Sequence, residues 1–538
     1  MKRPALKAPP EKLVRVLLSF GVAAIAGWQL LPWLQADALS LISAGHVKDD
    51  AFFYSVLVDR YAEAGMFTLD GTMSTNGFQP LWMGLLLILR GLVDDLSSFE
   101  LVRQLSWFSY VLFCATATWF VSQGGSWPAL VRSVVLAAFL LLNRSFQDAL
   151  VEGLEPPLAL LVLTLSLLFL APLTKKLRSA EADSRAQLVS ACLLGFAGAL
   201  VFLARTDLFW LTCLLVVWTY WLSGRRPLAA IALGLSAALL VLPYLYWNWS
   251  DQGSLVPVSG RVKVFLMDSF LESRTIDYWD TEEWRGLISL FGTWLPKTSR
   301  EAMIVLSYGS ILAALGVVFG PRGRRELPDA YRVLGVLVCL HCAYMQLVYR
   351  EVRPYTNYYF APEAFFVVLA FGAWFATLTP KVGTSVLIAG LMLASQASWG
   401  ALDMSKRSYW THRIAISKDT EKAAKGAPVG SFWPGTLAGV TKLDVTPLDG
   451  IIGSNDYFEN YVKEGRELDY AFEKGLAYIV VNGNPKRFLG AKAPKVDRWS
   501  TMDSHKLWEH RERFKVVKRR GPWTLLKVLY PSSTPSSG

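Results

Sequence analysis

Residues 46–65 read HVKDDAFFYSVLVDRYAEAG, so that two adjacent aspartates, Asp49 and Asp50, follow the first long apolar segment of the chain. From Asp50 to about residue 63 the apolar side chains recur at helical spacing, and Gly65 is suited to end the helix. A helix N-cap would account for one aspartate but not for the pair. A carboxylate at a membrane surface can also act as a general base, and a neighbouring carboxylate raises its pKa towards neutral pH. The stretch therefore leaves two interpretations open, a capped helix and an acidic pair that takes part in a reaction.

The rest of the chain is apolar over most of its length. Of its 538 residues, 53% are hydrophobic and only 18% are charged, and the mean hydropathy is +0.33. This composition indicates a polytopic membrane protein. The net charge of +11 fits the cytoplasmic loops of such a protein, and we expect no nucleic-acid partner. The five cysteines lie in apolar segments, so no disulfide framework is expected, and the motif CLHC at 339–342 predicts helix packing because it lacks a second ligand pair.

Apolar segments that are candidates for membrane spans recur along the first 400 residues. They lie near residues 13–35, 79–93, 103–122, 128–142, 157–172, 187–204, 207–222, 227–247, 301–320, 332–349, 363–378 and 383–400. Segment 79–93 is short for a span and carries Arg90. If it does not span, the basic loops TKKLR, SGRRP and GPRGRR all lie on the cytoplasmic side with the N-terminus, as the positive-inside rule favours. We therefore expect a mostly α-helical protein with about 11 transmembrane helices, in which a first outer loop over residues 36–102 carries two surface helices.

This topology places on the outer face the polar motifs that are hard to explain as spans. They are KDDAFF (48–53), STNGFQPLW (74–82), NRSFQDALVEGLEPPL (143–158), LARTDL (203–208), NWSDQGSLVPVSGRVK (248–263) and YREVRPYTNYYFAPE (349–363). A transporter or flippase would place polar residues at mid-depth in several spans and would show inverted repeats, and neither feature is visible. Polar motifs at one surface are typical of an enzyme that works at the outer leaflet. A non-catalytic protein that binds a lipid-linked saccharide remains a further alternative.

The last part of the chain, residues 401–538, differs from the membrane domain at residues 1–400. It is polar, and its run LAYIVVN (476–482) predicts a buried strand. The run FKVVKRRGPWTLLKVLY (514–530) predicts a terminal hairpin, and the tail PSSTPSSG is typical of a flexible segment. We expect a small extracytoplasmic α/β domain here. The apolar run after the basic N-terminus is long for a signal peptide, so we expect a retained first span with the N-terminus in the cytoplasm.

The stretch DDAFFYSVLVDRYAEAGMFTLDGTMSTNGFQPLW (49–82) resembles the first outer loop of the GT-C superfamily of integral-membrane glycosyltransferases. This superfamily includes protein O-mannosyltransferases, lipid A aminoarabinose transferases and mycobacterial terminal arabinofuranosyltransferases. The shared pattern is an acidic pair, an amphipathic helix, a glycine-rich turn and a polar-Pro-Leu helix along the membrane. The blocks GLEPPL, LARTDL, LVPVSGRVK and VTPLDGIIGSNDYF are similar to further blocks of bacterial members.

The resemblance implies a bacterial inner-membrane enzyme that takes its sugar from a polyprenyl-phosphate donor and inverts the anomeric carbon. It also implies that a first-loop aspartate is the catalytic base, with Asp49 as first choice and Asp50 as its partner. The second acid is often Glu in the protein mannosyltransferases and is Asp here, so the acceptor class does not carry over. A glycan, a lipid-linked glycan and a protein all remain open as acceptors. The sugar is also open, with arabinofuranose and a hexose such as mannose as the candidates.

Basic residues on the outer face are candidates for holding the phosphate of such a donor. They are Arg261, Lys263, Arg350 and Arg353, which run against the positive-inside trend. Arg and Lys would stabilise the negative charge that grows on a phosphate leaving group. The alternative is that these side chains extend to the interface or pair with Glu351 or Glu363.

Other polar residues of the outer face are candidates for orienting a substrate. Arg205 and Asp207 either close a helical hairpin as a local ion pair or contact the substrate. Glu155 either complements the dipole of the span that follows or orients the donor sugar. Asn76 and Gln79 are suited to hydrogen-bond a sugar.

A divalent cation is the one cofactor that these residues suggest. Asp49, Asp50 and Glu155 together are of the type that holds Mg²⁺ or Mn²⁺. Regular ligand spacing is missing from the sequence, however, and Arg and Lys alone can neutralise a phosphate. The sequence therefore leaves the metal requirement open.

Overall fold

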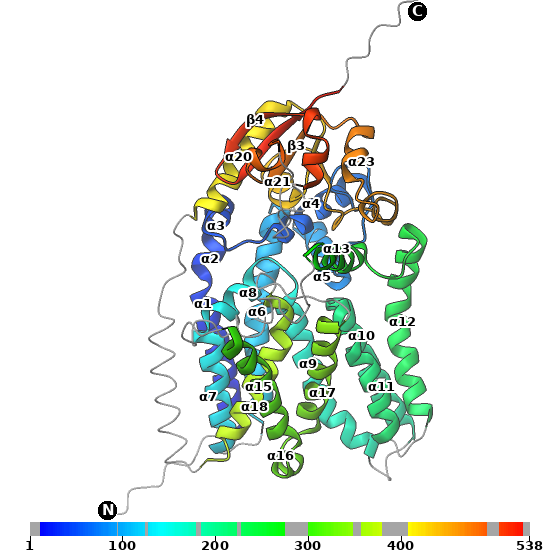
Figure 1. Cartoon of the computed structure of the whole chain (residues 1–538). Helices are drawn as coiled ribbons and strands as arrows, with labels where there is room; N and C mark the ends of the chain where they lie inside the picture. Colours follow the sequence, from blue (N-terminus) through cyan, green and yellow to red (C-terminus); the bar gives the residue numbers. More distant parts are fainter. Residues whose placement is uncertain are drawn as a thin grey trace, which may run out of the picture.

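The computed structural model describes residues 11–93, 95–123, 127–178, 184–222, 227–274, 300–347, 357–378, 407–491 and 505–530. Figure 1 shows a bundle of helices that carries a small α/β unit at its upper end. We call this unit, which comprises residues 407–491 and 505–530, the C-terminal unit. The predicted boundary between the two parts, near residue 400, lies outside the described residues.

The bundle is built from the apolar segments of the sequence. Its helices are α1 (Glu11–Gln29), α6 (Ser98–Val121), α7 (Trp127–Leu142), α9 (Pro156–Arg178), α10 (Ser184–Ala204), α11 (Trp210–Leu222), α12 (Pro227–Gln252), α15 (Arg300–Phe319), α17 (Asp329–Leu347) and α18 (Ala361–Phe375). Each overlaps one predicted span, and the predicted span at 383–400 lies outside the described residues. By length and composition, 4 described helices can cross a membrane, or 5 if the bent pair of α7 and α8 (Arg144–Val151) counts as one. The number of spans, about 11, stays a prediction.

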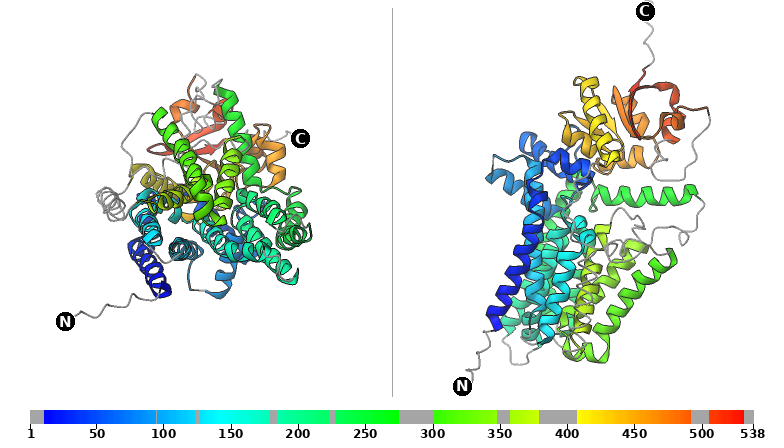
Figure 2. Two further views of the ribbon diagram at one scale, coloured as in Figure 1. Left: turned by 90° about the horizontal axis from the view of Figure 1, so that it is seen from below. Right: turned by 90° about the vertical axis from the view of Figure 1, so that its left-hand side faces the viewer.

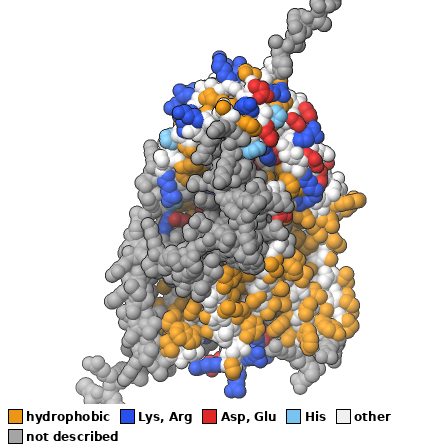
Figure 3. Space-filling model, viewed as in Figure 1, with side chains coloured by type: hydrophobic (Ala, Val, Ile, Leu, Met, Phe, Trp, Pro, Cys, Tyr) orange, Lys and Arg blue, Asp and Glu red, His pale blue; other side chains and the backbone are white. Residues whose placement is uncertain are grey.

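The outer surface of the bundle is apolar, as contact with lipid requires. Figure 3 shows hydrophobic side chains over the bundle and charged ones over the C-terminal unit and at the opposite end. On α12, Leu235, Leu239 and Tyr246 are each 67% exposed. The basic helix α16 (Pro321–Glu326) lies at the end of the bundle away from the C-terminal unit, where the positive-inside rule would place the cytoplasm (Figure 1).

A layer of further helices lies between the bundle and the C-terminal unit (Figures 1 and 2). It contains α2 (Leu31–Gln35), α3 (Ala38–Ala44), α4 (Asp49–Ala64), α5 (Pro80–Leu92) and α13 (Val258–Arg274). Helix α4 is the predicted first-loop helix, and Gly65 ends it with a φ of 71°. Helix α5 has 13 residues and is too short to cross a membrane alone, in agreement with the prediction for 79–93.

The C-terminal unit contains a 5-stranded sheet in the order β2-β1-β3-β5-β4. Its strands are β1 (Val429–Ser431), β2 (Val445–Pro447), β3 (Tyr478–Asn482), β4 (Phe514–Arg520) and β5 (Trp523–Val528). Strands β2, β1 and β3 are parallel, and β5 runs antiparallel to both β3 and β4. Strand β3 and the hairpin β4–β5 confirm the strand predicted at 476–482 and the hairpin predicted at 514–530.

Helices of the C-terminal unit cover the sheet and reach down to the first outer loop. They are α20 (Ser408–Ala424), α21 (Pro434–Val440), α22 (Asn455–Tyr457), the π-helical turn η4 (Phe458–Val462), α23 (Glu467–Glu473), α24 (Pro485–Phe488) and η5 (Arg511–Arg513). Leu468, Ile479, Phe488 and Leu526 form the core of the unit and are almost completely buried. From this sheet, α20 contacts α3 and α21 contacts α4 in the layer below.

Candidate functional site

A cavity of about 450 Å³ lies where the upper end of the bundle meets the C-terminal unit. The polar side chains of its wall include Asp50, Tyr54, Gln79, Glu155, Asp207, Lys263, Tyr358 and Tyr359. Apolar side chains from α10, α11, α12 and the adjoining segments form another part of the wall, and they include Phe202, Phe209, Val241, Leu245, Leu255 and Val256. Ile451 and Ile452 of the C-terminal unit complete it. A wall of this kind suits a ligand that has both charged and apolar parts.

Asp50 contributes a carboxylate to this cavity from the first turn of α4. Burial raises the pKa of Asp50 above its usual value, the positive charge of Lys263 opposes this shift, and the negative charge of Asp49 adds to it. A raised pKa brings a carboxylate closer to the range in which it is an effective base at neutral pH.

Asp49 does not line the cavity and is bound by the C-terminal unit instead. Its carboxylate pairs with the guanidinium of Arg413 in α20 and accepts hydrogen bonds from the backbone N–H groups of Gly435 and Thr436. The hydroxyl of Thr436 donates a further hydrogen bond of 2.8 Å. Asp49 is 7% exposed, so these partners replace water almost completely. The sequence preferred Asp49 as the base, but the structure brings Asp50 to the cavity.

The capping interpretation of the acidic pair is wrong. The residue before α4 is Lys48, and no side chain caps the helix. Asp49 and Asp50 are its first two residues, and their carboxylates point to different partners. Successive residues of an α-helix lie about 100° apart around the axis, which explains why two neighbours face different surroundings.

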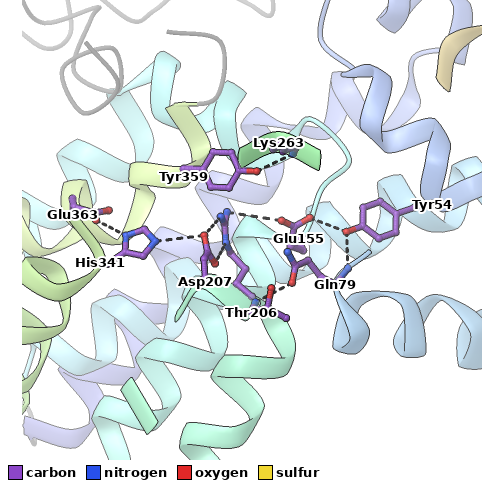
Figure 4. A network of polar contacts seen from close by, with 10 residues as sticks. Tyr54, Gln79, Glu155, Thr206, Asp207, Lys263, His341, Tyr359 and Glu363 are labelled. Atoms are coloured by element: carbon purple, nitrogen blue, oxygen red, sulfur yellow. Dashed lines mark hydrogen bonds and ion pairs between the residues drawn. The ribbon is translucent and has the colours of Figure 1, made fainter. Parts of the chain in front are cut away.

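A chain of buried charged groups begins inside the bundle and ends at the cavity (Figure 4). Nδ1 of His341 lies 2.5 Å from Oε1 of Glu363, and Nε2 of His341 lies 3.4 Å from Oδ2 of Asp207. Arg205 binds the same carboxylate through Nε at 3.0 Å and Nη2 at 2.5 Å. The local Arg205–Asp207 pair expected from the sequence is confirmed, and the structure adds His341 and Glu363 behind it.

The chain continues from Arg205 towards the first outer loop. Nη1 of Arg205 lies 3.8 Å from Oε1 of Glu155, whose other oxygen accepts a hydrogen bond of 3.2 Å from the hydroxyl of Tyr54. That hydroxyl in turn accepts from the backbone N–H of Gln79 at 3.2 Å. The side-chain oxygen of Gln79 accepts from the N–H of Thr206 at 3.0 Å. Glu155 and Gln79 are therefore held at the cavity wall, and their role in orienting a ligand stays a prediction.

Lys263 in α13 is the described basic residue that lines the cavity next to Asp50. Its ammonium donates a hydrogen bond of 2.9 Å to the hydroxyl of Tyr359 in η3 (Asn357–Phe360). The guanidinium of Arg205 lies 4.7 Å from the centre of the same ring. Tyr359 thus separates two cationic groups and fixes the position of both.

The other predicted phosphate ligands are placed differently. Arg261 pairs with Glu459 and Asn455 of the C-terminal unit and does not line the cavity. Arg350 and Arg353 lie outside the described residues. Asn76 is fully buried, and its side-chain oxygen accepts a hydrogen bond of 2.9 Å from the N–H of Val258 at the start of α13. Asn76 therefore fixes α13 rather than facing the cavity.

Comparison with solved structures connects this architecture to known enzymes. The oligosaccharyltransferase AglB from Archaeoglobus fulgidus, solved with an inhibitory peptide and a dolichol-phosphate, matches with a TM-score of 0.50 over 97% of this chain and 75% of its own, at 13% identity. ArnT from Cupriavidus metallidurans, solved with undecaprenyl phosphate, matches with a TM-score of 0.51 over 93% of this chain and 98% of its own, at 11% identity. The chain has the GT-C fold. No family model and no curated protein sequence matches it.

Within the GT-C fold, the resemblance that the first outer loop suggested is confirmed at the level of architecture. The divalent cation that the sequence leaves open stays a prediction. Of its three candidate ligands, Asp49 has a carboxylate that is already bound by Arg413 and Thr436. In the described ranges, no three His, Cys, Asp or Glu side chains come together in a way that could hold a metal ion.

Several residues of this GT-C site were missed by reasoning from the sequence. The sequence predicts helix packing for His341 and an ion pair with an outer-face arginine for Glu363, and it gives no role to Tyr54 or Arg413. His341 and Glu363 are each 0% exposed. Ionisable residues within apolar helices are costly to bury unless they are paired, so the histidine in CLHC was a usable signal. Arg413 gave no such signal, because its partner Asp49 is 364 positions away.

Proposed function

We propose that the chain is an inverting glycosyltransferase that moves a sugar from a polyprenyl-phosphate donor to an acceptor hydroxyl on the extracytoplasmic face of the membrane. The observation that carries this proposal is the composition of one cavity, where the carboxylate of Asp50 and the ammonium of Lys263 lie beside an apolar wall. The GT-C fold supports it, since AglB and ArnT were solved with dolichol-phosphate and undecaprenyl phosphate respectively.

The proposed reaction assigns one task to each side of the cavity. Asp50 takes the proton of the acceptor hydroxyl while the hydroxyl oxygen attacks the anomeric carbon. The bond between that carbon and the phosphate oxygen breaks, and the lipid phosphate leaves with the electron pair. Lys263 stabilises the phosphate through charge and hydrogen bonding. Attack opposite to the leaving group inverts the anomeric carbon.

The remaining wall residues would position the donor. Glu155 and Tyr54 present hydrogen-bonding groups for sugar hydroxyls, and Gln79 is fixed beside them. Phe202, Val241 and Leu245 offer an apolar surface for the first isoprene units of the lipid. Arabinofuranose and a hexose such as mannose remain the candidate sugars. A glycan, a lipid-linked glycan or a protein remains the candidate acceptor.

The test is mass spectrometry of the purified full chain, reconstituted in lipid and given a panel of polyprenyl-phosphate sugars with a cell-envelope glycan extract as acceptor. Asp50→Asn and Asp49→Asn run in parallel. We expect one donor to be consumed, with a matching mass gain on an acceptor, and we expect Asp50→Asn to slow both changes by about 10²–10⁴-fold. A wild-type protein that binds a donor and leaves it intact would instead be a binder or flippase of lipid-linked saccharide.

A further inference from the structure

Helix α21 of the C-terminal unit lies directly on the first turns of α4. Gly435 and Gly439 face α4 at a spacing of four residues, which places both on one side of α21. A Cβ atom at Gly435 would overlap the backbone of Asp49, and one at Gly439 would overlap the ring of Phe52. Only glycine allows this approach, and it brings the N–H groups of Gly435 and Thr436 to the carboxylate of Asp49.

Arg413 provides the positive charge of this contact and is itself enclosed. Its side chain is 3% exposed, and its guanidinium donates a second hydrogen bond of 3.2 Å to the carbonyl oxygen of Trp433. The guanidinium carbon lies within 4.8–5.9 Å of the ring centres of three tryptophans, which are Trp410, Trp433 and Trp523. A pair this far from water is screened little, and the loss of either partner would leave a buried charge.

Other contacts attach the first outer loop to the same unit. Lys474 donates a hydrogen bond of 2.5 Å to Asp70, and Thr446 donates one of 3.1 Å to the same carboxylate oxygen. Arg60 at the far end of α4 pairs with the exposed Asp444. The attachment is therefore extensive, and the contact at Asp49 is the one that adjoins the cavity.

We propose that Asp49 is a positioning residue through which the C-terminal unit fixes the place and the electrostatic surroundings of Asp50. The proposal rests on the proposed function, because it takes Asp50 as the base. The two aspartates share a peptide bond, so a shift of Asp49 on α21 moves Asp50 relative to the cavity wall. Displacements of about 1 Å in a reacting group cost on the order of 100-fold in rate.

Asp49 and Arg413 shift the pKa of Asp50 in opposite directions. Asp49 raises the pKa of Asp50, while Arg413 lowers it, as do Lys263 and Lys48. Asp49→Asn removes a negative charge and leaves the positive charge of Arg413 uncompensated. The pKa of Asp50 therefore falls. Arg413→Gln removes a positive charge, so the pKa of Asp50 rises. Within the described ranges, Tyr54, Glu152 and Tyr358 also interact with Asp50, and both variants retain them.

The experiment uses the full chain in lipid nanodiscs, with wild type, Asp49→Asn, Arg413→Gln and the control Asp444→Asn, which breaks an exposed ion pair of the same interface. With the donor that wild type consumes, we expect kcat of Asp49→Asn and Arg413→Gln to fall by about 10- to 100-fold. The KM for the donor should change by less than about threefold, since the lipid-binding wall is untouched. The acid limb of the rate profile should move to lower pH in Asp49→Asn and to higher pH in Arg413→Gln.

Hydrogen exchange is measured on the same samples and needs no donor. Amides of residues 50–54 and of α21 should exchange about tenfold faster in Asp49→Asn than in Asp444→Asn. Parallel shifts of the two acid limbs, or unchanged exchange in Asp49→Asn, would overturn the proposal. Abolished turnover in Asp49→Asn with native exchange would identify Asp49 as the base and overturn it as well. If no donor reacts with wild type, the proposed function fails, and the exchange data still decide whether Asp49 couples the two helices.

Discussion

Two groups of buried charges, one around Asp49 next to the cavity-lining Asp50 and one around Arg205, differ in how completely their hydrogen-bonding groups are paired. The carboxylate of Asp49 binds one guanidinium, two backbone N–H groups and one hydroxyl, all from the C-terminal unit. In the other group, Nη1 of Arg205 and Oε2 of Glu363 are buried without a hydrogen-bond partner in the described part of the chain. Buried polar groups are normally paired, so an unpaired one calls for an explanation.

The comparison separates a structural contact from a site that is prepared for a ligand. A carboxylate that has filled its hydrogen-bonding capacity has none left for a substrate, so Asp49 holds the structure together. Nη1 of Arg205 lies 3.8 Å from Glu155, which itself lines the cavity. Arg205 does not line the cavity itself, so its unused donor can act on a ligand there through Glu155. Mutations in the two groups should therefore differ both in the property that they change and in the size of the change.

The largest effect is expected for Asp50→Asn. The amide has nearly the shape of the carboxylate but cannot take a proton, so turnover should fall by about 10²–10⁴-fold, the usual contribution of a general base. Donor binding and thermal unfolding should stay close to wild type, because among the described residues Asp50 has no set of hydrogen-bond partners like that of Asp49. The measurement is single-turnover transfer by mass spectrometry. Turnover within a factor of about three of wild type would remove Asp50 from the mechanism.

Arg413→Ala should produce the largest loss of stability. It leaves the carboxylate of Asp49 buried without its counter-charge, a change that costs about 3–5 kcal/mol in other buried pairs. We expect a clear drop in the temperature of thermal unfolding and faster proteolytic release of the C-terminal unit. Asp444→Asn at the exposed Arg60 pair is the matched control and should cost no more than about 1 kcal/mol. Equal stability of the two variants would show that the contact at Asp49 is weak.

Arg205→Lys should reduce kcat/KM by about 10- to 100-fold, since lysine cannot bind Asp207 through two nitrogens and reach Glu155 as well. Stability should fall less than in Arg413→Ala, because a positive charge is retained. The measurement is the donor dependence of the rate. A variant with normal kcat/KM would show that the unpaired donor of Arg205 has no role in the reaction.

His341→Gln should have a smaller effect, of roughly tenfold or less on kcat/KM, because His341 acts on the cavity only through Asp207. The double variant with Arg205→Lys tests that path. If His341 works by holding Asp207, the two losses should be less than additive when expressed as free energies. Full additivity would mean that His341 acts by another route.

The smallest effect concerns Glu152, whose pKa burial raises to about 6, against the attraction of Lys48. A carboxyl with a raised pKa destabilises the folded protein as the pH rises through its unfolded and folded pKa values. Glu152→Gln removes this penalty, so it should stabilise the protein by up to about 2 kcal/mol above pH 6 and by little at about pH 4.5. Thermal unfolding of both proteins across this range checks the sign. A gain that is larger at low pH would contradict it.

Local features of the structure could be predicted from the sequence because their causes are local. The helix that ends at Gly65, the Arg205–Asp207 pair and the strand at 476–482 each depend on neighbouring residues. The apolar segments predicted the bundle helices for the same reason. The first outer loop was similar enough to the GT-C pattern to predict the fold, although identity to the solved structures is only 11–13%.

The role of each aspartate could not be predicted, because it depends on which distant segment packs against it. Nothing near Asp49 indicates that Arg413 and Thr436 will surround it. The position of Arg261 could not be predicted either, because it is bound to Asn455 and Glu459 of the C-terminal unit instead of lining the cavity. An acidic pair in a sequence thus indicates where a site lies more reliably than it indicates which of the two carboxylates has which role.

The close packing of α21 on α4 also has a genetic consequence. Gly435 and Gly439 lie in the C-terminal unit and do not line the cavity, yet neither has room for a single methyl group. In a saturation mutagenesis screen for activity, these two glycines should tolerate as few substitutions as Asp50 itself. A map of intolerant positions would then show a second cluster away from the cavity, and that cluster would trace the surface through which one part of the protein holds the other in place.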